Sequence, residues 1–581
     1  MRAFLFQVRE LIRMLLAWLT QRPYHPCLHE PEDDCEGRPR FVVVQVDGLA
    51  HEYLLRALAA GHTPYIQRLI AQGYRLQRWR CGLPSSTPAS QSGIMYGNNW
   101  DIPAFRWYEK DTGLAPHCKS PAFAARIKEH VSAGGRPGIL AGGSSYGNLV
   151  DGDARLALFT LSAMGRQRFY EGLRGLGWAF LFALIPWRII RIIALIIWEL
   201  ARDFTLTFWR WIRSGFRKRL TLIKPVLQVL TNVVFGEIQT FGVLLDVYRG
   251  MPSVYVNFYG YDEVAHGDGP LGQEAMRALR RIDSYVGQID RIRRVYQPDT
   301  RLYILSDHGM SPAIPITEIG PKRPLGKFIA EYVKDSVASD EALLRPGWTP
   351  AQTDLSGESF RWLLDELDGI ESHLSPRAQR LARALRKKVV DRLPPDPDSG
   401  YDLGRGADVV VRVSGNVAHI YFNVARERMD VSEMALLYPN LIDALNDHPG
   451  IGLLLGLENG RPVVITSRGT AALTPEVLPP GLAEPTQSTA DLARLLSFPH
   501  SGDLIVIGAW NAKGRVVTFE NQAATHGGVG GPQDYPFLLA PPQSTLDVSN
   551  VVHSSQIYPY FIRTYHNGRE ATEPGPAERS K

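Results

Sequence analysis

The sequence is poor in cysteine and nearly balanced in charge, and it has no internal repeats. Its four cysteines, Cys27, Cys35, Cys81 and Cys118, lack the close spacing of a zinc knuckle or a redox pair. Cys27 and Cys35 flank an acidic loop and fit either a disulfide or two free thiols. A formal net charge of +5 over 581 residues is too small to indicate a nucleic-acid-binding protein, so no nucleic-acid partner is expected.

Long uninterrupted apolar runs are also missing, because charges break both apolar stretches. The first, residues 4–19, contains Arg9, Glu10 and Arg13, and no small-residue cleavage site follows it. This argues against a cleaved signal peptide. Most of its polar residues fall on one helical face, which predicts an amphipathic helix lying either on a membrane or on the protein itself.

The second apolar stretch, about residues 169–248, interleaves tryptophan with arginine and lysine. Arg188 and Arg191 interrupt it, and each would cost roughly 2.5–3.5 kcal/mol at the centre of a spanning helix. Interfacial amphipathic helices fit this pattern better, with tryptophan at headgroup depth and cations on anionic lipid. We expect a membrane-associated helical insertion; a helical subdomain packed on the core is the alternative.

Strand-like and helix-like segments alternate along most of the chain. The apolar patterns predict strands at 41–46, 253–258 and 301–305, and helices at 51–72 and 273–296. Such alternation is typical of an α/β fold with a doubly wound, mostly parallel sheet.

A small α+β cap is expected late in the chain. Two hairpins lie between residues 409 and 466, the second turning at Asn459-Gly460, with a helix at 432–446 between them. The apolar segment 503–508 is expected to return the chain to the core. We predict three core segments, at 39–168, 249–330 and 501–565. An amphipathic helix and linker (1–38) precede them, and the insertion (169–248) and the helical linker with the cap (331–500) separate them. A disordered tail (566–581) follows.

Aspartate and histidine residues follow apolar strands in segments that are far apart in the sequence: Asp47, Asp262, His266, Asp307, His308 and His526. Open α/β sheets place their ligands at the carboxyl ends of the strands. Carboxylate and imidazole ligands suit zinc, and the carboxylates also admit manganese or magnesium. Such a set can hold two divalent ions, which would clamp the attacking and leaving oxygens of a phosphoryl transfer.

These segments resemble the alkaline phosphatase superfamily, and most of all its type I phosphodiesterase/nucleotide pyrophosphatase branch. The matching motifs are Val46-Asp47-Gly48, Tyr261-Asp262 with His266, Asp307-His308-Gly309-Met310 and Thr525-His526-Gly527. The resemblance implies an alkaline phosphatase-like core and hydrolysis of phosphate esters. It also implies two metal sites, one held by Asp262, His266 and His526 and the other by Asp47, Asp307 and His308.

The nucleophile implied by the resemblance is Thr87, which would also be a metal ligand, and Ser86 is the neighbouring alternative. Amides at a helix N-terminus and a metal would lower the pKa of its hydroxyl. Asn98 and Asn99 are candidates for the asparagine that contacts the phosphate in this family. Pro88 stands where family phosphodiesterases usually carry an aromatic residue that stacks on a nucleotide base.

The sequence therefore predicts a metal-dependent phosphodiesterase or phosphatase with two divalent ions, Zn²⁺ being preferred to Mn²⁺ or Mg²⁺. The expected partners are a phosphate-ester substrate and a membrane surface, to which the protein would be bound peripherally or monotopically. A position at the membrane would favour a lipid-linked substrate. Two alternatives are a membrane headgroup transferase of the same superfamily and a non-catalytic membrane scaffold.

Overall fold

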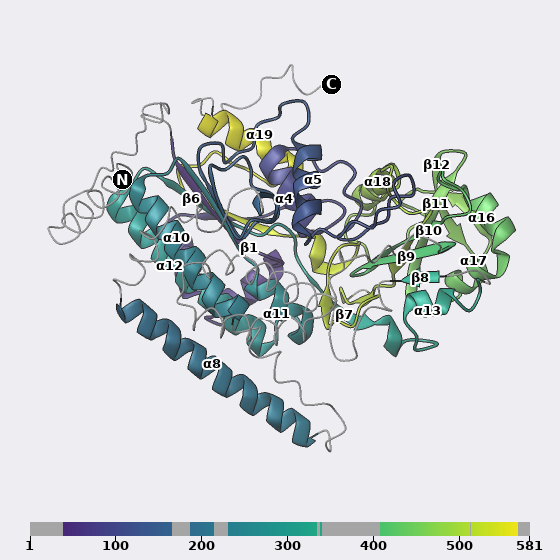
Figure 1. Ribbon diagram of the computed structural model, residues 1–581, viewed down its shortest axis with the longest axis horizontal. Helices are drawn as coiled ribbons and strands as arrows, with labels where there is room; N and C mark the ends of the chain where they lie inside the picture. Colours follow the sequence, from purple (N-terminus) through teal and green to yellow (C-terminus); the bar gives the residue numbers. More distant parts are fainter. Residues whose placement is uncertain are drawn as a thin grey trace, which may run out of the picture.

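The computed structural model describes residues 39–164, 186–213, 230–333, 337–339, 407–511 and 513–566. The expected N-terminal helix with Cys27 and Cys35, nearly all of the helical linker before the cap, and the polar tail lie outside the described residues. The described parts form two seven-stranded sheets and one of three strands, with helices packed on both large sheets (Figure 1).

The first large sheet is the mostly parallel sheet that the sequence predicts. Its strand order is β2-β17-β6-β1-β5-β3-β4. β1 pairs in parallel with β5 and β6, and β17 runs antiparallel to β6. The bounds are Phe41–Val46 (β1), Arg75–Arg78 (β2), Ser144–Tyr146 (β3), Leu156–Leu158 (β4), Ser253–Phe258 (β5), Arg301–Leu305 (β6) and Phe537–Ala540 (β17).

β1 is buried on both faces, as a parallel strand between two helical layers must be. Val42 and Val44 pack into one apolar cluster, whereas Phe41 and Val43 pack into a second cluster on the opposite face. The first face is covered by α2 (His51–Ala59), α3 (Pro64–Ala71), α10 (Gly236–Arg249), α11 (Gly260–Asp268) and α12 (Gln273–Tyr296). The second is covered by α4 (Thr87–Tyr96), α5 (Pro121–Val131) and α19 (Tyr558–Phe561).

The second large sheet forms the cap, in the order β13-β12-β11-β14-β10-β9-β8. Both expected hairpins are confirmed as the antiparallel pairs β9–β10 and β11–β12. The strands are Val337–Ser339 (β8), Val409–Ser414 (β9), Val417–Phe422 (β10), Ile451–Glu458 (β11), Arg461–Thr466 (β12), Gly469–Ala472 (β13) and Leu504–Gly508 (β14). The helices are α13 (Leu325–Ile329), α16 (Val431–Leu437), α17 (Pro439–Asn446) and α18 (Pro485–Leu496).

Three expectations about strands and helices are wrong. β14 does not return to the core sheet but lies inside the cap, between β10 and β11, because a short buried apolar run fits either sheet equally well. The expected helix at 51–72 is two helices separated at Gly61 and Pro64, and the helix at 432–446 breaks at Pro439. Proline lacks the N–H that a continuing helix needs, so it starts a new helix instead.

The inserted region contributes α8 (Pro186–Arg213), which lies along the outside of the molecule beside α12 (Figure 1). Its Glu199 forms an ion pair with Arg281 of α12, and its Arg202 forms one with Glu274. Large exposed side chains lie along its outer face: Ile190, Ile193, Ile197, Trp198, Phe208, Trp209 and Ile212. Among the described residues, no helix combines the length and apolar character needed to cross a membrane.

Candidate active site

Five of the six candidate ligands meet at the carboxyl edge of the core sheet. Asp47 follows β1, and Asp262 and His266 lie on successive turns of α11 after β5. Asp307 and His308 follow β6. Because β5, β1 and β6 are adjacent and parallel, their ends bring together residues that are more than 200 positions apart.

The sixth ligand, His526, comes from the small sheet β15-β7-β16, with bounds Val516–Thr518 (β15), Ser311–Pro315 (β7) and Ala524–Thr525 (β16). β7 directly follows the segment with His308 and pairs antiparallel with β16. This pairing stacks the imidazoles of His526 and His308, with ring centroids 4.0 Å apart and planes inclined by 22°.

All three imidazoles are oriented by backbone carbonyl groups. Nδ1 lies 2.9 Å from the Ala524 carbonyl in His266, 2.8 Å from that of Gly309 in His308, and 3.0 Å from that of Ser85 in His526. A carbonyl oxygen only accepts, so each Nδ1 carries a proton, and Nε2 is the atom of each ring that can coordinate a cation. This is how protein scaffolds orient histidines that bind metals.

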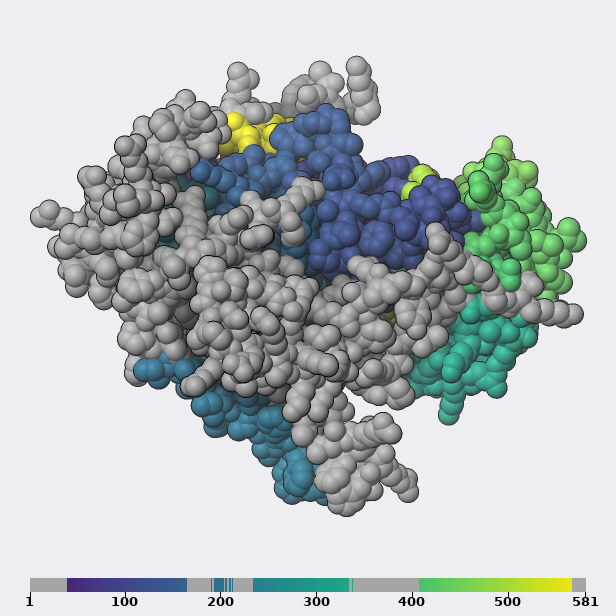
Figure 2. Space-filling model, viewed as in Figure 1, coloured from purple at the N-terminus to yellow at the C-terminus, as the bar shows by residue number. Residues whose placement is uncertain are grey.

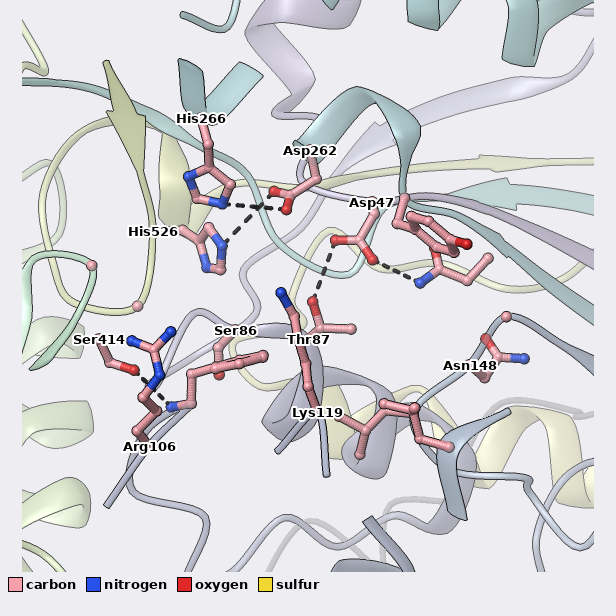
Figure 3. A pocket seen from close by; sticks show the side chains of 18 of the residues that line it. Asp47, Ser86, Thr87, Arg106, Lys119, Asn148, Asp262, His266, Ser414 and His526 are labelled. Carbon is pink, nitrogen blue, oxygen red and sulfur yellow. Dashed lines mark hydrogen bonds and ion pairs between the residues drawn. The ribbon is translucent and has the colours of Figure 1, made fainter. Parts of the chain in front are cut away.

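The Nε2 atoms face the carboxylates in two adjoining sets, and Figure 3 shows the contacts of His266 and His526 with Asp262. His266 Nε2 lies 3.3 Å from Asp262 Oδ2, and His526 Nε2 lies 3.8 Å from Asp262 Oδ1. His308 Nε2 lies 3.5 Å from Asp47 Oδ1 and 3.6 Å from Asp307 Oδ2.

This grouping differs in one respect from the ligand sets that the resemblance implies. The ligand atoms that lie within 4.8 Å of one another are those of Asp262, His308 and His526 in one group. Asp47, Asp307 and again His308 form the other. His308 therefore faces both sets, whereas His266 adjoins the first set through Asp262.

Burial makes this cluster of carboxylates costly without a cation. Desolvation, together with repulsion from Asp307 and Asp262, raises the pKa of Asp47 well above its usual value. Desolvation also raises the pKa of Asp307, although the neighbouring His308 acts against it. No described side chain hydrogen-bonds to Asp307. The groups near its oxygens are the backbone amides of residues 307 and 308 and, at 3.6 Å, Nε2 of His308.

The pKa values around Asp262 are shifted in a different way. Desolvation acts to raise the pKa of Asp262 and to lower that of His266, but their mutual attraction outweighs both effects. The pKa of Asp262 therefore falls and that of His266 rises. Desolvation and the nearby His308 lower the pKa of His526, which keeps this imidazole neutral and able to coordinate. The buried carboxylate oxygens and neutral imidazole nitrogens thus fit divalent cations.

The close approach of Asp262 to the segment that carries Asp47 depends on Gly48. It adopts φ +70°, and a Cβ at this position would lie 2.3 Å from Asp262 Oδ1. Asn257 fixes Asp47 by donating a 2.7 Å hydrogen bond from Nδ2 to Oδ2. Asn257 lies opposite Gln45 in the β1–β5 register. The motifs do not single out Asn257 or Gln45, although each is a polar residue that interrupts an apolar strand.

Thr87 is the first residue of α4 and lies at the junction with the second set. Its Oγ1 donates a 3.3 Å hydrogen bond to Asp47 Oδ1 (Figure 3). The same atom is 3.2 Å from His308 Nε2. Ser86 lines the same cavity, but its buried hydroxyl makes no hydrogen bond to any described residue. Of the two candidate nucleophiles, Thr87 is the one in contact with the candidate ligands.

The structure does not bring Asn98 and Asn99 to this site, which corrects their assignment to substrate binding. They follow the opposite end of α4, about 15 Å from Thr87 for a ten-residue helix. Asn99 accepts a 2.7 Å hydrogen bond from Arg494, and Asn98 donates to the Val131 carbonyl. Their spacing in the sequence does not show that α4 separates both asparagines from Thr87.

The cavity in front of Thr87 has a volume of about 160 Å³ and includes residues that the sequence did not single out. Arg106 lines it but forms a 2.7 Å ion pair with Glu520. Lys119 extends into the cavity in the direction of Thr87 (Figure 3), 5.3 Å from the ring centroid of Phe105. Within the described parts of the chain, no carboxylate pairs with Lys119.

Comparison with protein families supports the chemistry of this site. Residues 215–348 match the family model described as type I phosphodiesterase / nucleotide pyrophosphatase, and this segment contains Asp262, His266, Asp307 and His308. The phosphodiesterase resemblance is thereby confirmed. The match indicates that this phosphodiesterase-like chain is a phosphoric ester hydrolase. No curated protein matches the chain significantly.

Solved structures of other proteins resemble the chain only distantly. Phosphonoacetate hydrolase from Sinorhizobium meliloti 1021, in complex with phosphonoformate, has 13% identity and a TM-score of 0.46, covering 90% of this chain and 95% of its own. Inactive murine ectonucleotide pyrophosphatase / phosphodiesterase 5, in complex with AMP, has 10% identity and a TM-score of 0.41, covering 92% and 96%. Because these TM-scores lie below 0.5, the likenesses carry no inference about activity.

Replacing Asp307 tests whether the buried carboxylates hold a cation. Its raised pKa means that the folded state disfavours its negative charge, so Asp307→Asn should stabilise the metal-free protein by about 1–3 kcal/mol. Zn²⁺ or Mn²⁺ should raise the melting temperature of the wild type and have much less effect on the variant. Calorimetry with and without a chelator measures both effects. The exposed Asp299→Asn is the control, and an equal metal response in all three proteins contradicts the assignment.

Proposed function

We propose that the protein hydrolyses phosphate esters at a membrane surface, with Thr87 as the nucleophile and two divalent metal ions, Zn²⁺ being the preferred ion. The observation that carries this proposal is the position of the Thr87 hydroxyl, in contact with both Asp47 and His308 where the two ligand sets meet. Asp262, His266 and His526 would hold one ion, and Asp47, Asp307 and His308 the other. Bound ions would neutralise charge on the phosphoryl oxygens and lower the pKa of the Thr87 hydroxyl.

Side chains of the protein position the attacking hydroxyl of Thr87. The hydrogen bond from Thr87 to Asp47 fixes the hydroxyl, and Asn257 fixes Asp47 in turn. Oγ1 of Thr87 then attacks phosphorus, the ester bond to the leaving alcohol breaks, and a phosphothreonine forms. Water hydrolyses this ester in a second step and restores Thr87.

Lys119 supplies a positive charge on the substrate side of the cavity. Its ammonium group has no described carboxylate partner, so it is available to an anionic oxygen of the substrate. A charge-assisted contact of this kind binds more strongly than a neutral hydrogen bond. We assign Lys119 to substrate binding.

Membrane attachment is supported by the orientation of α8. The helix turns Glu199 and Arg202 toward α12 and leaves an apolar face exposed, the reverse of a helix packed for solubility. Figure 2 shows α8 at the edge of the molecule, where it can contact a flat surface. A long apolar face with tryptophan suits the headgroup boundary of a bilayer.

Substitution of Thr87 tests the nucleophile. With Zn²⁺ or Mn²⁺ added, we expect Thr87→Ala to lose at least about 10³-fold in kcat on bis(p-nitrophenyl) phosphate, since the covalent step is removed. Thr87→Ser keeps a hydroxyl and should retain measurable turnover. Release of p-nitrophenol gives the rates, and Tm checks folding. Wild-type rates in Thr87→Ala would show that another group attacks; transfer to an added alcohol would identify a transferase.

Removal of the Lys119 charge should lower kcat/KM about 10- to 100-fold in Lys119→Met, because a charged contact of about 1.5–3 kcal/mol is lost. Lys119→Arg keeps the charge and should recover most of this loss. Steady-state kinetics at several salt concentrations provide the measurement, with Lys513→Met, which lies outside the cavity, as the control. Equal effects of the methionine and arginine variants would argue against a role for the charge.

The membrane contact is tested by Trp198→Asp/Trp209→Asp, which places charges on the exposed face of α8. We expect at least a tenfold loss of binding to vesicles of anionic phospholipid, measured by co-sedimentation, because apolar insertion becomes unfavourable. Leu436→Asp is the matched control, since Leu436 is 82% exposed on α16 of the cap. Undiminished vesicle binding by the double variant would exclude α8 as the docking face.

A further inference from the structure

Five apolar side chains line the cavity in front of Thr87, and we call them its apolar wall: Leu149, Phe159, Leu161, Met164 and Phe235. The rings of Phe159 and Phe235 pack together with centroids 4.9 Å apart and planes inclined by 33°. Leu161 and Met164 remain half-buried, so they present apolar surface that a ligand can cover.

Phe159 holds an unusual backbone conformation in this wall. Its φ is +54°, a left-handed value that is a real outlier for a bulky aromatic residue. Such backbone persists only where the surrounding packing determines it, and it clusters at ligand-binding sites. The strained residue places its ring against Phe235, which follows α8 within the inserted region.

The apolar wall also borders the inserted region. Met164 is the last described residue before the insertion, and Phe235 ends the π-helix Leu230–Phe235 that contacts α8. The chain that carries the exposed apolar face of α8 thus leaves and rejoins the core at the rim of the cavity. A ligand on the wall of the cavity therefore lies close to the segment that we propose to dock on the membrane.

Apart from Phe105, Tyr259 and three glycines, the remaining lining of the cavity is polar or charged. Thr87, Asp47 and Asp262 lie at one end, and Lys119 extends into the same space. Asn148, which also faces the cavity, already uses its amide on Gln91 and Ser145. The wall consequently offers apolar contact rather than hydrogen-bonding groups that would read a nucleotide base.

We infer that this wall is a subsite for a hydrocarbon group, so that the substrate is a phosphate ester of a long-chain or glycerolipid alcohol. The inference rests on the proposed function, because Thr87 must attack the phosphorus of the same molecule. In this arrangement the phosphoryl group lies at Thr87 and the first carbons of the alkyl group lie against the apolar wall.

A series of p-nitrophenyl alkyl phosphates with methyl, butyl and hexyl groups tests the subsite. All members share one leaving group and one charge, so differences report the alkyl chain alone. For the wild type with Zn²⁺, we expect kcat/KM to rise about two- to fourfold per methylene over the first carbons. In Leu161→Asn/Met164→Gln, which preserves side-chain size but adds amides, the hexyl-to-methyl ratio should fall at least fivefold.

The matched control is Leu114→Asn, an exposed leucine outside the cavity, which should keep the wild-type ratio. A hexyl-to-methyl ratio that is the same in the wild type and the double variant overturns the subsite. A wild-type preference for p-nitrophenyl thymidine 5′-phosphate over the hexyl ester overturns it in favour of a nucleotide.

Binding to the Thr87→Ala variant separates failure of the subsite from failure of the proposed function. Methyl-, butyl- and hexylphosphonate are titrated calorimetrically in the presence of Zn²⁺. Affinity that rises with chain length and is weakened by Leu161→Asn/Met164→Gln supports the subsite even if the wild type hydrolyses no ester. Affinity independent of chain length overturns it even if hydrolysis is observed.

Discussion

Repulsion among buried carboxylates is the constraint on which the architecture of the site depends. Asp47 and Asp307 lie in the interior with raised pKa values, and Asp262 adds a third negative charge nearby. Three such groups destabilise a fold unless a cation or a proton compensates them. The imidazoles of His308 and His526, held with Nε2 toward the carboxylates, make a divalent cation the natural compensation.

The fold meets this constraint through a few local features. Parallel pairing of β1 with β5 and β6 brings the ligand-bearing strand ends together, and Gly48 leaves room for Asp262 to approach. The cap contributes as well. The turn at Gly415 has φ +67° and packs so tightly on the backbone of His526 that a Cβ there would lie 1.9 Å from its carbonyl oxygen. Catalytic core and cap therefore stabilise the same site.

The insertion connects the chemistry to the surface of the molecule. It leaves the core after Met164 and rejoins it before Phe235, and both residues line the cavity of Thr87. α8, in the same insertion, turns its apolar face outward while Glu199 and Arg202 hold it on α12. This arrangement supports the proposal that the protein acts on a hydrocarbon-bearing ester at a membrane surface.

The amino-acid sequence determined the core strands, because β1, β5 and β6 are apolar runs with abrupt polar ends, and it identified the six candidate ligands and Thr87 by motif. It could not assign β14 to the cap, since a short apolar strand carries no mark of its partners. Lys119 and the apolar wall also carry no sequence signal, and the polar residue Asn257 interrupts an apolar strand without showing what it contacts. Their roles depend on which distant segments pack together, and only the tertiary structure decides that, because long-range contacts leave no periodic pattern in the chain.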